Sequence, residues 1–145
     1  MKRAAVMLII KDGLILGVSR PNDDTKFGLA GGKIETNETP KEAAIRETKE
    51  ETSIEVAECV EIFKHKEKND YETHCFYATK WSGEPKEVEK SKVKWLTGEE
   101  LIYTKAAFGE YNKEAIKRLQ EKFPDVKIKF SKSTKQSIEN IKNKS

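Results

Sequence analysis

The sequence contains few cysteines, histidines and prolines: of 145 residues, 2 are cysteine, 2 are histidine and 4 are proline. Cys59 and Cys75 lie far apart and lack CxxC spacing, so we expect reduced cysteines that pack in the core rather than a disulfide. His65 and His74 are each alone in the sequence. We expect them on strands, at the surface or in the core, and not in catalysis.

Long apolar runs are also missing. No stretch approaches the roughly 20 apolar residues that a membrane-spanning helix needs. The N-terminal apolar run 4–10 is not followed by a small-residue cleavage site of the kind that ends a secretory signal. We therefore expect a cytoplasmic protein without a membrane partner.

Charge, in contrast, is abundant and nearly balanced. Charged residues make up 37% of the chain and hydrophobic residues 36%, with a net charge of +3. Because the lysines are spread along the chain and form no stripe, we expect no stable nucleic-acid partner. The length fits one domain with a sizeable core, as a monomer or homodimer.

The most informative stretch predicts a helix rich in glutamate. Thr39 fits the N-cap, Pro40 fits the first helical position, and Glu42 completes a capping box with Thr39. Helical spacings of three and four residues then bring side chains onto one face. Three carboxylates share that face: Glu47, Glu50 and Glu51.

Such crowding of like charge needs a physical reason. Residues 35–55 hold seven glutamates and three basic residues, a net charge of −4. Each like-charge pair destabilises a helix by about 0.2–0.5 kcal/mol, which a bound cation would offset. Carboxylates without His or Cys favour Mg²⁺ or Mn²⁺ over Zn²⁺. The alternative is a solvated surface helix, but the preceding Gly31-Gly32 pair favours a ligand because its backbone can be approached closely.

The stretch resembles the Nudix box, G-x5-E-x7-R-E-U-x-E-E-x-G-U, where U is a bulky aliphatic residue. The matching positions are Gly32, Glu38, Arg46, Glu47, Glu50, Glu51 and Ile54. Two positions depart from the motif: Thr48 replaces an aliphatic residue, and Ser53 replaces the glycine that ends the helix. A left-handed backbone costs a non-glycine residue about 1 kcal/mol or more, so we expect Ser53 to weaken the helix end.

The rest of the chain predicts mostly strands, with a second helix late in the sequence. The Asp12-Gly13 pair predicts a hairpin turn, and polar loops are expected at 21–26 and 64–70. This order predicts an α+β fold. The resemblance implies a Nudix-type α/β/α sandwich with a mixed β-sheet over residues 1–130. Residues 131–145 have almost no apolar content, so we expect a polar, mobile tail or a loosely attached helix. Strands are expected at 4–10, 14–18, 56–64, 71–81, 93–96 and, as an edge strand, 126–130; helical segments are expected at 98–101 and 112–123.

The resemblance also implies roles for individual residues. Glu47 is expected to hold metal or take the proton of water, Arg46 to fix the carboxylates, and Glu50 to act with them in catalysis. Arg46 can also orient Glu50 by an i,i+4 ion pair. Because Mg²⁺ takes about six oxygen ligands, further donors are expected outside the helix. The expected metal ligands are Glu47, Glu50, Glu51, the carbonyl of Gly31, and Glu89, with Glu87 as second choice for the last.

Four residues are expected to meet the substrate or support its loop. Arg20 or Lys33 would bind phosphates, and Glu38 would support the loop or join the metal ligands. Phe27 either packs in the core, which we favour, or stacks on a base.

The implied activity is hydrolysis of the phosphoanhydride bond of a nucleoside diphosphate linked to another moiety, with Mg²⁺ or Mn²⁺. Small size and the lack of other subfamily marks favour a MutT-like nucleoside triphosphate pyrophosphohydrolase that releases a nucleoside monophosphate and pyrophosphate. Tyr71, seventeen residues past Ile54, keeps a dinucleoside polyphosphate hydrolase open. A non-catalytic module that binds a nucleotide or an RNA end is the remaining alternative.

Overall fold

The computed structural model describes residues 2–88, 91–103 and 108–130 of the chain. The predicted tail, 131–145, lies outside these residues. In chain order the elements are β1 (Lys2–Leu8), β2 (Ile10–Lys11), β3 (Leu14–Arg20), β4 (Asp23–Lys33), α1 (Pro40–Thr52), β5 (Glu55–Lys66), β6 (Tyr71–Ser82), β7 (Val93–Leu96), α2 (Gly98–Ile102) and α3 (Gly109–Lys122).

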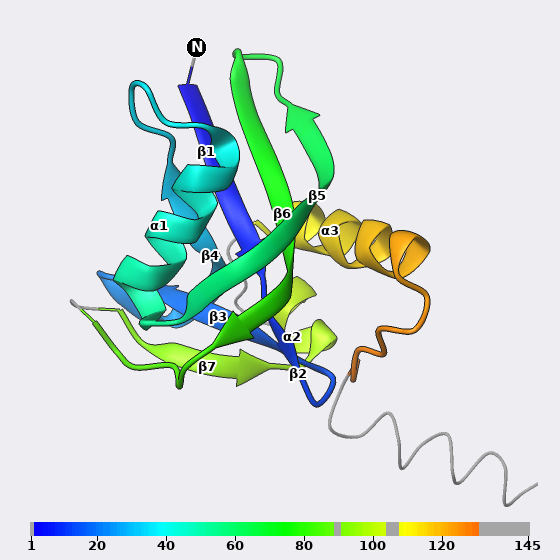
Figure 1. Ribbon diagram of the computed structural model, residues 1–145. Coiled ribbons are helices and arrows are strands. Elements are labelled where there is room, and N and C mark those ends of the chain that lie inside the picture. The colour runs from blue at the N-terminus through cyan, green and yellow to red at the C-terminus, as the bar shows by residue number, and fades with distance from the viewer. Residues whose placement is uncertain (1, 89–90, 104–107, 131–145) are drawn as a thin grey trace, which may run out of the picture.

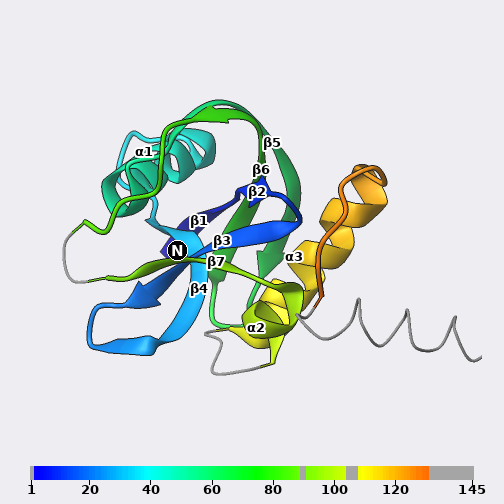
Figure 2. The same cartoon turned by 90° about the horizontal axis from the view of Figure 1, so that it is seen from below.

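The strands form one mixed sheet in the order β2-β3-β4-β1-β6-β5, with β7 paired to β3. Strand β1 lies near the centre, antiparallel to β4 and parallel to β6. Helix α1 lies on one side of the strands and helices α2 and α3 on the other (Figures 1 and 2). The described residues therefore have the α/β/α sandwich arrangement and the mixed sheet that were predicted.

Successive residues of β1 point to opposite faces of the sheet, and both faces are buried by core clusters. Met7 belongs to the core cluster that includes Ala43 and Ala44 of α1. Leu8 belongs to a second cluster, which includes Leu119 of α3. Burial on both sides explains why residues 4–10 read as a continuous apolar run and not as an alternating one.

Several local predictions are confirmed. Asp12 and Gly13 both have positive φ and connect β2 to β3, as a two-residue hairpin turn requires. Cys59 and Cys75 are free and buried. His65 lies on the surface of β5, and His74 is buried in β6. None of the helices described is long and apolar enough to cross a membrane.

Other predictions are wrong at the element boundaries. The proposed loop at 21–26 is only a tight turn, because Asp23 already pairs with Arg20 and begins β4. The apolar run 4–10 divides into β1 and β2, and strand β5 extends to Lys66, into the proposed loop at 64–70. Val60, an apolar residue of the expected strand at 56–64, is 40% exposed. Register shifts along β5 break the regular alternation of inward and outward residues there.

The expected edge strand at 126–130 does not form. The amide of Lys129 donates to the carbonyl oxygen of Gly13 at 2.8 Å, and the carbonyl of Lys129 accepts from the amide of Gly98, also at 2.8 Å. The hydrogen bonds of this segment therefore go to a turn and to the start of α2, not along a neighbouring strand. Val126 and Ile128 still pack against the second core cluster.

Candidate active site

Helix α1 begins and ends as its sequence predicts. The amide of Glu42 donates to Thr39 Oγ1 at 3.1 Å, and the amide of Thr39 donates to Glu42 Oε1 at 2.9 Å, which completes the capping box. Ser53 takes the left-handed conformation at the other end, with φ 69°, and its amide donates to the carbonyl oxygen of Lys49. Local sequence thus fixes where the helix starts and stops, and with it the direction of each carboxylate.

Arg46 forms hydrogen bonds with several glutamates. Its Nε lies 2.6 Å from Glu38 Oε2, and its Nη2 lies 3.0 Å from Glu38 Oε1, so the two groups meet as a fork. Nη1 donates to Glu47 at 3.0 Å and to Glu50 at 3.2 Å, and Nη2 also donates to the carbonyl oxygen of Lys33 at 3.1 Å. One guanidinium therefore joins the loop before α1 to two carboxylates of the helix.

The predicted ion pair between Arg46 and Glu50 is present, but the contact with Glu38 is closer and bidentate. The hydrogen bond to Glu38 is also the main reason why the pKa of Arg46 is raised. In return, the hydrogen bond from Arg46 and that from the amide of Glu35 lower the pKa of Glu38. Glu38 thus ties the loop before α1 to Arg46.

Glu47 lies beside Gly32, and its side chain is 19% exposed. Burial raises the pKa of Glu47, and the nearby Glu50 adds to that effect, while Arg46 opposes it. A carboxyl in this setting is held less firmly in its charged form than an ordinary surface glutamate. A cation placed beside it would reverse that tendency.

Glu51 reaches from α1 to strand β4. Its Oε1 accepts a hydrogen bond of 2.7 Å from the amide of Gly31. The structure therefore brings the double glycine and the third carboxylate together. The expected role of the Gly31 carbonyl as a metal ligand stays a prediction.

The donor atoms of these residues suit a divalent cation, but in the structure they do not point towards one common position. The side chains offer carboxylate oxygens and no nitrogen or sulfur, as Mg²⁺ and Mn²⁺ prefer. However, among the residues described, no group of three or more acidic, histidine or cysteine side chains is arranged to hold a metal. Contacts to Arg46 and Gly31 account for this, because they engage Glu47, Glu50 and Glu51 individually.

Of the two acids proposed outside the helix, Glu89 lies outside the described residues, and its role stays a prediction. Glu87 is exposed, and its carboxylate lies 3.8 Å from Nζ of Lys92.

A cavity of about 640 Å³ opens next to Gly31, Gly32 and Glu51. Its walls also include residues of β1, β3, β6 and α3. Arg20 and Tyr71 line it, as do several residues that sequence reasoning did not single out, namely Thr73, Asn69, Phe108, Tyr111 and Asn112. They come from separate parts of the chain, so no local pattern marks them as neighbours.

The remaining predicted substrate residues lie elsewhere. Phe27 pairs with Ser19 across the sheet, packs against the second core cluster and is not among the residues that line the cavity. The side chain of Lys33 is exposed, and its carbonyl oxygen binds Arg46. Glu38 is in the Arg46 network and not in the cavity.

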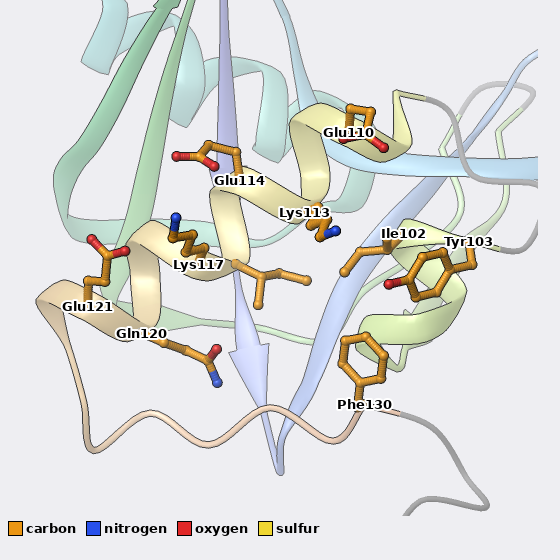
Figure 3. Close-up of a pocket in the computed structure, with 10 residues that line it drawn as sticks. Ile102, Tyr103, Glu110, Lys113, Glu114, Lys117, Gln120, Glu121 and Phe130 are labelled. Carbon is orange, nitrogen blue, oxygen red and sulfur yellow. The ribbon is translucent and has the colours of Figure 1, made fainter.

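A second hollow, of about 710 Å³, lies between α2, α3 and the segment that ends at Phe130 (Figure 3). Exposed Lys and Glu side chains of α3 surround it, and Tyr103 and Phe130 face each other with ring centroids 6.0 Å apart. No residue of α1 or of the double glycine reaches it. The smaller cavity, which touches those residues, is therefore the candidate active site.

The comparisons with known proteins find relatives that match most of the chain. The NUDIX domain family matches residues 1–119. The CTP pyrophosphohydrolase of Escherichia coli strain K12 is 29% identical over 101 residues, which cover 66% of this chain and 75% of that protein. The solution structure of the E. coli ORF135 protein aligns with a TM-score of 0.71 and 26% identity, over 86% of this chain and 94% of that one.

A further solved structure, a MutT NUDIX hydrolase from Burkholderia pseudomallei, shares the fold. It aligns with a TM-score of 0.65 and 24% identity, over 79% of this chain and 97% of that one. The family match covers most of the chain, including the whole of α1 and its glutamates. The protein belongs to the NUDIX domain family and is a Nudix hydrolase, an enzyme that acts on phosphoanhydride bonds.

Proposed function

We propose that the enzyme is a nucleoside triphosphate pyrophosphohydrolase that requires Mg²⁺ or Mn²⁺ and releases a nucleoside monophosphate and pyrophosphate. The observation that carries the proposal is the position of Glu51, which lines the 640 Å³ cavity and belongs to the same helix face as Glu47 and Glu50. A nucleoside in this cavity would direct its phosphates towards the acidic helix. The relative named CTP pyrophosphohydrolase makes CTP the first substrate to examine.

Each part of the site has a task in this reaction. The cavity binds the nucleoside, Arg20 of the cavity wall binds phosphate oxygens, and Lys33, which lies outside the cavity, is the second candidate for that role. Glu50 and Glu51, with the carbonyl of Gly31, would hold the metal, which leaves Glu47 to act as base. When bound, the metal neutralises phosphate charge and makes its water more acidic.

Glu47 is the proposed base. Burial raises the pKa of its carboxyl, and a base works best when its pKa approaches the working pH. Arg46 holds Glu47 and Glu50 in place through the hydrogen bonds described above. Arg46 itself stays charged, so its task is to position the acids and not to move a proton.

Tyr71 favours a second candidate substrate, because it lines the cavity where a second nucleoside could stack. Dinucleoside polyphosphates are therefore the alternative substrates. A non-catalytic binding module is less well supported, since the four acids and the arginine of the motif are all present.

The test is a panel of nucleoside triphosphates that includes CTP, together with dinucleoside polyphosphates, each assayed with Mg²⁺, with Mn²⁺ and with a chelator. We expect monophosphate and pyrophosphate from at least one triphosphate, and no product with the chelator. Release of single phosphates, or cleavage of dinucleoside polyphosphates alone, would contradict the triphosphate proposal. Binding without cleavage would indicate the non-catalytic module.

A pair of variants tests the role of Glu47. Glu47→Gln is expected to lower kcat by about 100-fold or more, as loss of a general base does. Glu114→Gln is the matched control, because Glu114 also pairs with an arginine on its own helix, Arg118, but lines the other hollow and not the candidate active site. Full turnover by Glu47→Gln would remove Glu47 from the mechanism.

A further inference from the structure

Phe108 has three features that disfavour the folded state. Its side chain is 72% exposed. Its backbone is left-handed, with φ 59° and ψ 47°, a conformation that bulky residues rarely adopt. It also occupies the N-cap of α3 without making a side-chain hydrogen bond, although Ser, Thr, Asp or Asn would satisfy the helix there. Strained residues of this kind often lie at ligand sites.

The ring of Phe108 lies at the candidate active site. Phe108 and Arg20 both line the cavity. The guanidinium carbon of Arg20 lies 5.6 Å from the centroid of the Phe108 ring, which is a cation–π contact. Arg20 ends strand β3, whereas Phe108 precedes α3, so the pair connects the two walls of the cavity.

Resting on the proposed function, we propose that Phe108 is the platform on which the substrate's base stacks, and that Arg20 occupies this platform while no nucleotide is bound. A base between ring and guanidinium needs two contact layers of about 3.5 Å each, roughly 7 Å in all. The observed 5.6 Å is too short. A base that stacks on this face must therefore displace Arg20.

Displacement of Arg20 gives the arginine a second task. Its planar guanidinium can meet phosphate oxygens by two hydrogen bonds. When the nucleotide binds, its base thus replaces Arg20 on the ring of Phe108, and Arg20 becomes available to the polyphosphate. The predicted phosphate role of Arg20 and its observed position over a ring are then two states of one side chain.

Stacking also defines the class of substrate. Every base has an aromatic face, so a stacking platform accepts different bases but gains nothing from a polyphosphate that lacks one. We expect a clear preference for nucleotides over inorganic tripolyphosphate and a modest preference among bases.

Two tryptophan variants test this directly. Phe108→Trp places a fluorescent ring at the platform, and Tyr103→Trp places one at a 60% exposed aromatic position that lines only the other hollow. The probes are a CTP analogue with a methylene group between its α and β phosphates, which resists cleavage there, and inorganic tripolyphosphate. We expect the CTP analogue to quench the tryptophan at position 108 and not the one at 103, and tripolyphosphate to quench neither.

Kinetics and stability of further variants separate a binding role from a structural one. Phe108→Ala is expected to raise KM for CTP about tenfold at unchanged kcat, because stacking stabilises ground state and transition state alike, and Phe108→Tyr should restore KM. Phe108→Gly should raise the thermal midpoint while it raises KM, because glycine relieves the left-handed strain. A structural role would instead lower the midpoint.

The outcomes also distinguish this inference from the proposed function. Hydrolysis of CTP with an unchanged KM in Phe108→Ala, or no quenching at position 108, would overturn the platform and leave the proposed function standing. Quenching at position 108 by the analogue without hydrolysis of any nucleotide would support the platform and refute the proposed function.

Discussion

The carboxyl group of Glu47 occupies the space that a side chain at position 32 would need. A Cβ built on Gly32 would lie 2.6 Å from Cδ of Glu47 and 2.8 Å from both of its carboxylate oxygens. The glycine is therefore required by a residue fifteen positions further along the chain. The neighbouring Gly31 is required for a different reason, since its φ of 151° and the close backbone of Ala5 and Val6 leave no room for a side chain.

This difference predicts that one alanine variant loses turnover and the other loses stability. Gly32→Ala should displace the flexible end of Glu47, keep the fold and lower kcat by at least about tenfold, because small misplacements of catalytic groups slow reactions strongly. Gly31→Ala should lower the thermal midpoint, since it meets the backbone of β1. Thermal denaturation and turnover of both proteins check this. Equal activity of Gly32→Ala and wild type would contradict the placement of Glu47.

Arg46→Lys should separate charge from geometry. Lysine keeps the positive charge but cannot contact Glu38 as a fork and Glu47 at the same time. We expect a loss of about 1 kcal/mol in the free energy of unfolding and a fall in kcat of about 100-fold. Arg118→Lys on α3 is the matched control, because that arginine contacts only one acid of its own helix in the described contacts. Similar losses in both variants would show that the Arg46 network has no special role.

Ser53→Gly should stabilise the protein. Ser53 ends α1 with φ 69°, where glycine avoids the strain of a side chain. We expect a gain of about 0.5–1 kcal/mol, or roughly 2–4 °C in the thermal midpoint, without a change in kcat. Differential scanning calorimetry measures this. A lower midpoint would mean that the serine side chain makes a contact worth more than the strain.

Glu42 makes the stability of α1 depend on pH. Hydrogen bonds from the amide of Thr39, and then from its side chain, lower the pKa of Glu42 in the folded protein. A lowered pKa stabilises the fold above the ordinary glutamate range, and this contribution is lost as pH falls through the folded pKa. Glu42→Gln should therefore be less stable than wild type near neutral pH, and the two should converge as pH falls through the folded pKa of Glu42.

Urea denaturation of both proteins across this range measures the convergence. Glutamine can still complete a capping box, so the helix start is preserved and the difference reports the charge. A constant gap between the two proteins at all pH values would show that the charge of Glu42 is not responsible.

Structural features that depend on residues close together in the sequence could be predicted from it, whereas features that depend on distant residues could not. The capping box, the hairpin turn at Asp12-Gly13 and the glutamate face of α1 rest on residues within a few positions of one another, and the structure shows all three. The prediction of a strand at 126–130 is wrong because the backbone hydrogen bonds of this segment go to Gly13 and Gly98, which are distant in the sequence. The exposure of Val60 is also not visible in the sequence, because register shifts in β5 break the regular alternation of its residues.

For the candidate site, the sequence alone determined the start and end of α1 and the shared face of its carboxylates, because backbone capping and helical periodicity are local. Only the tertiary structure decided that Glu51 meets the amide of Gly31, that Arg46 binds Glu38 more closely than Glu50, and that Phe108 lies under Arg20. The physical reason is that packing α1 and α3 against opposite faces of one sheet brings together strand ends and loops that no sequence pattern relates.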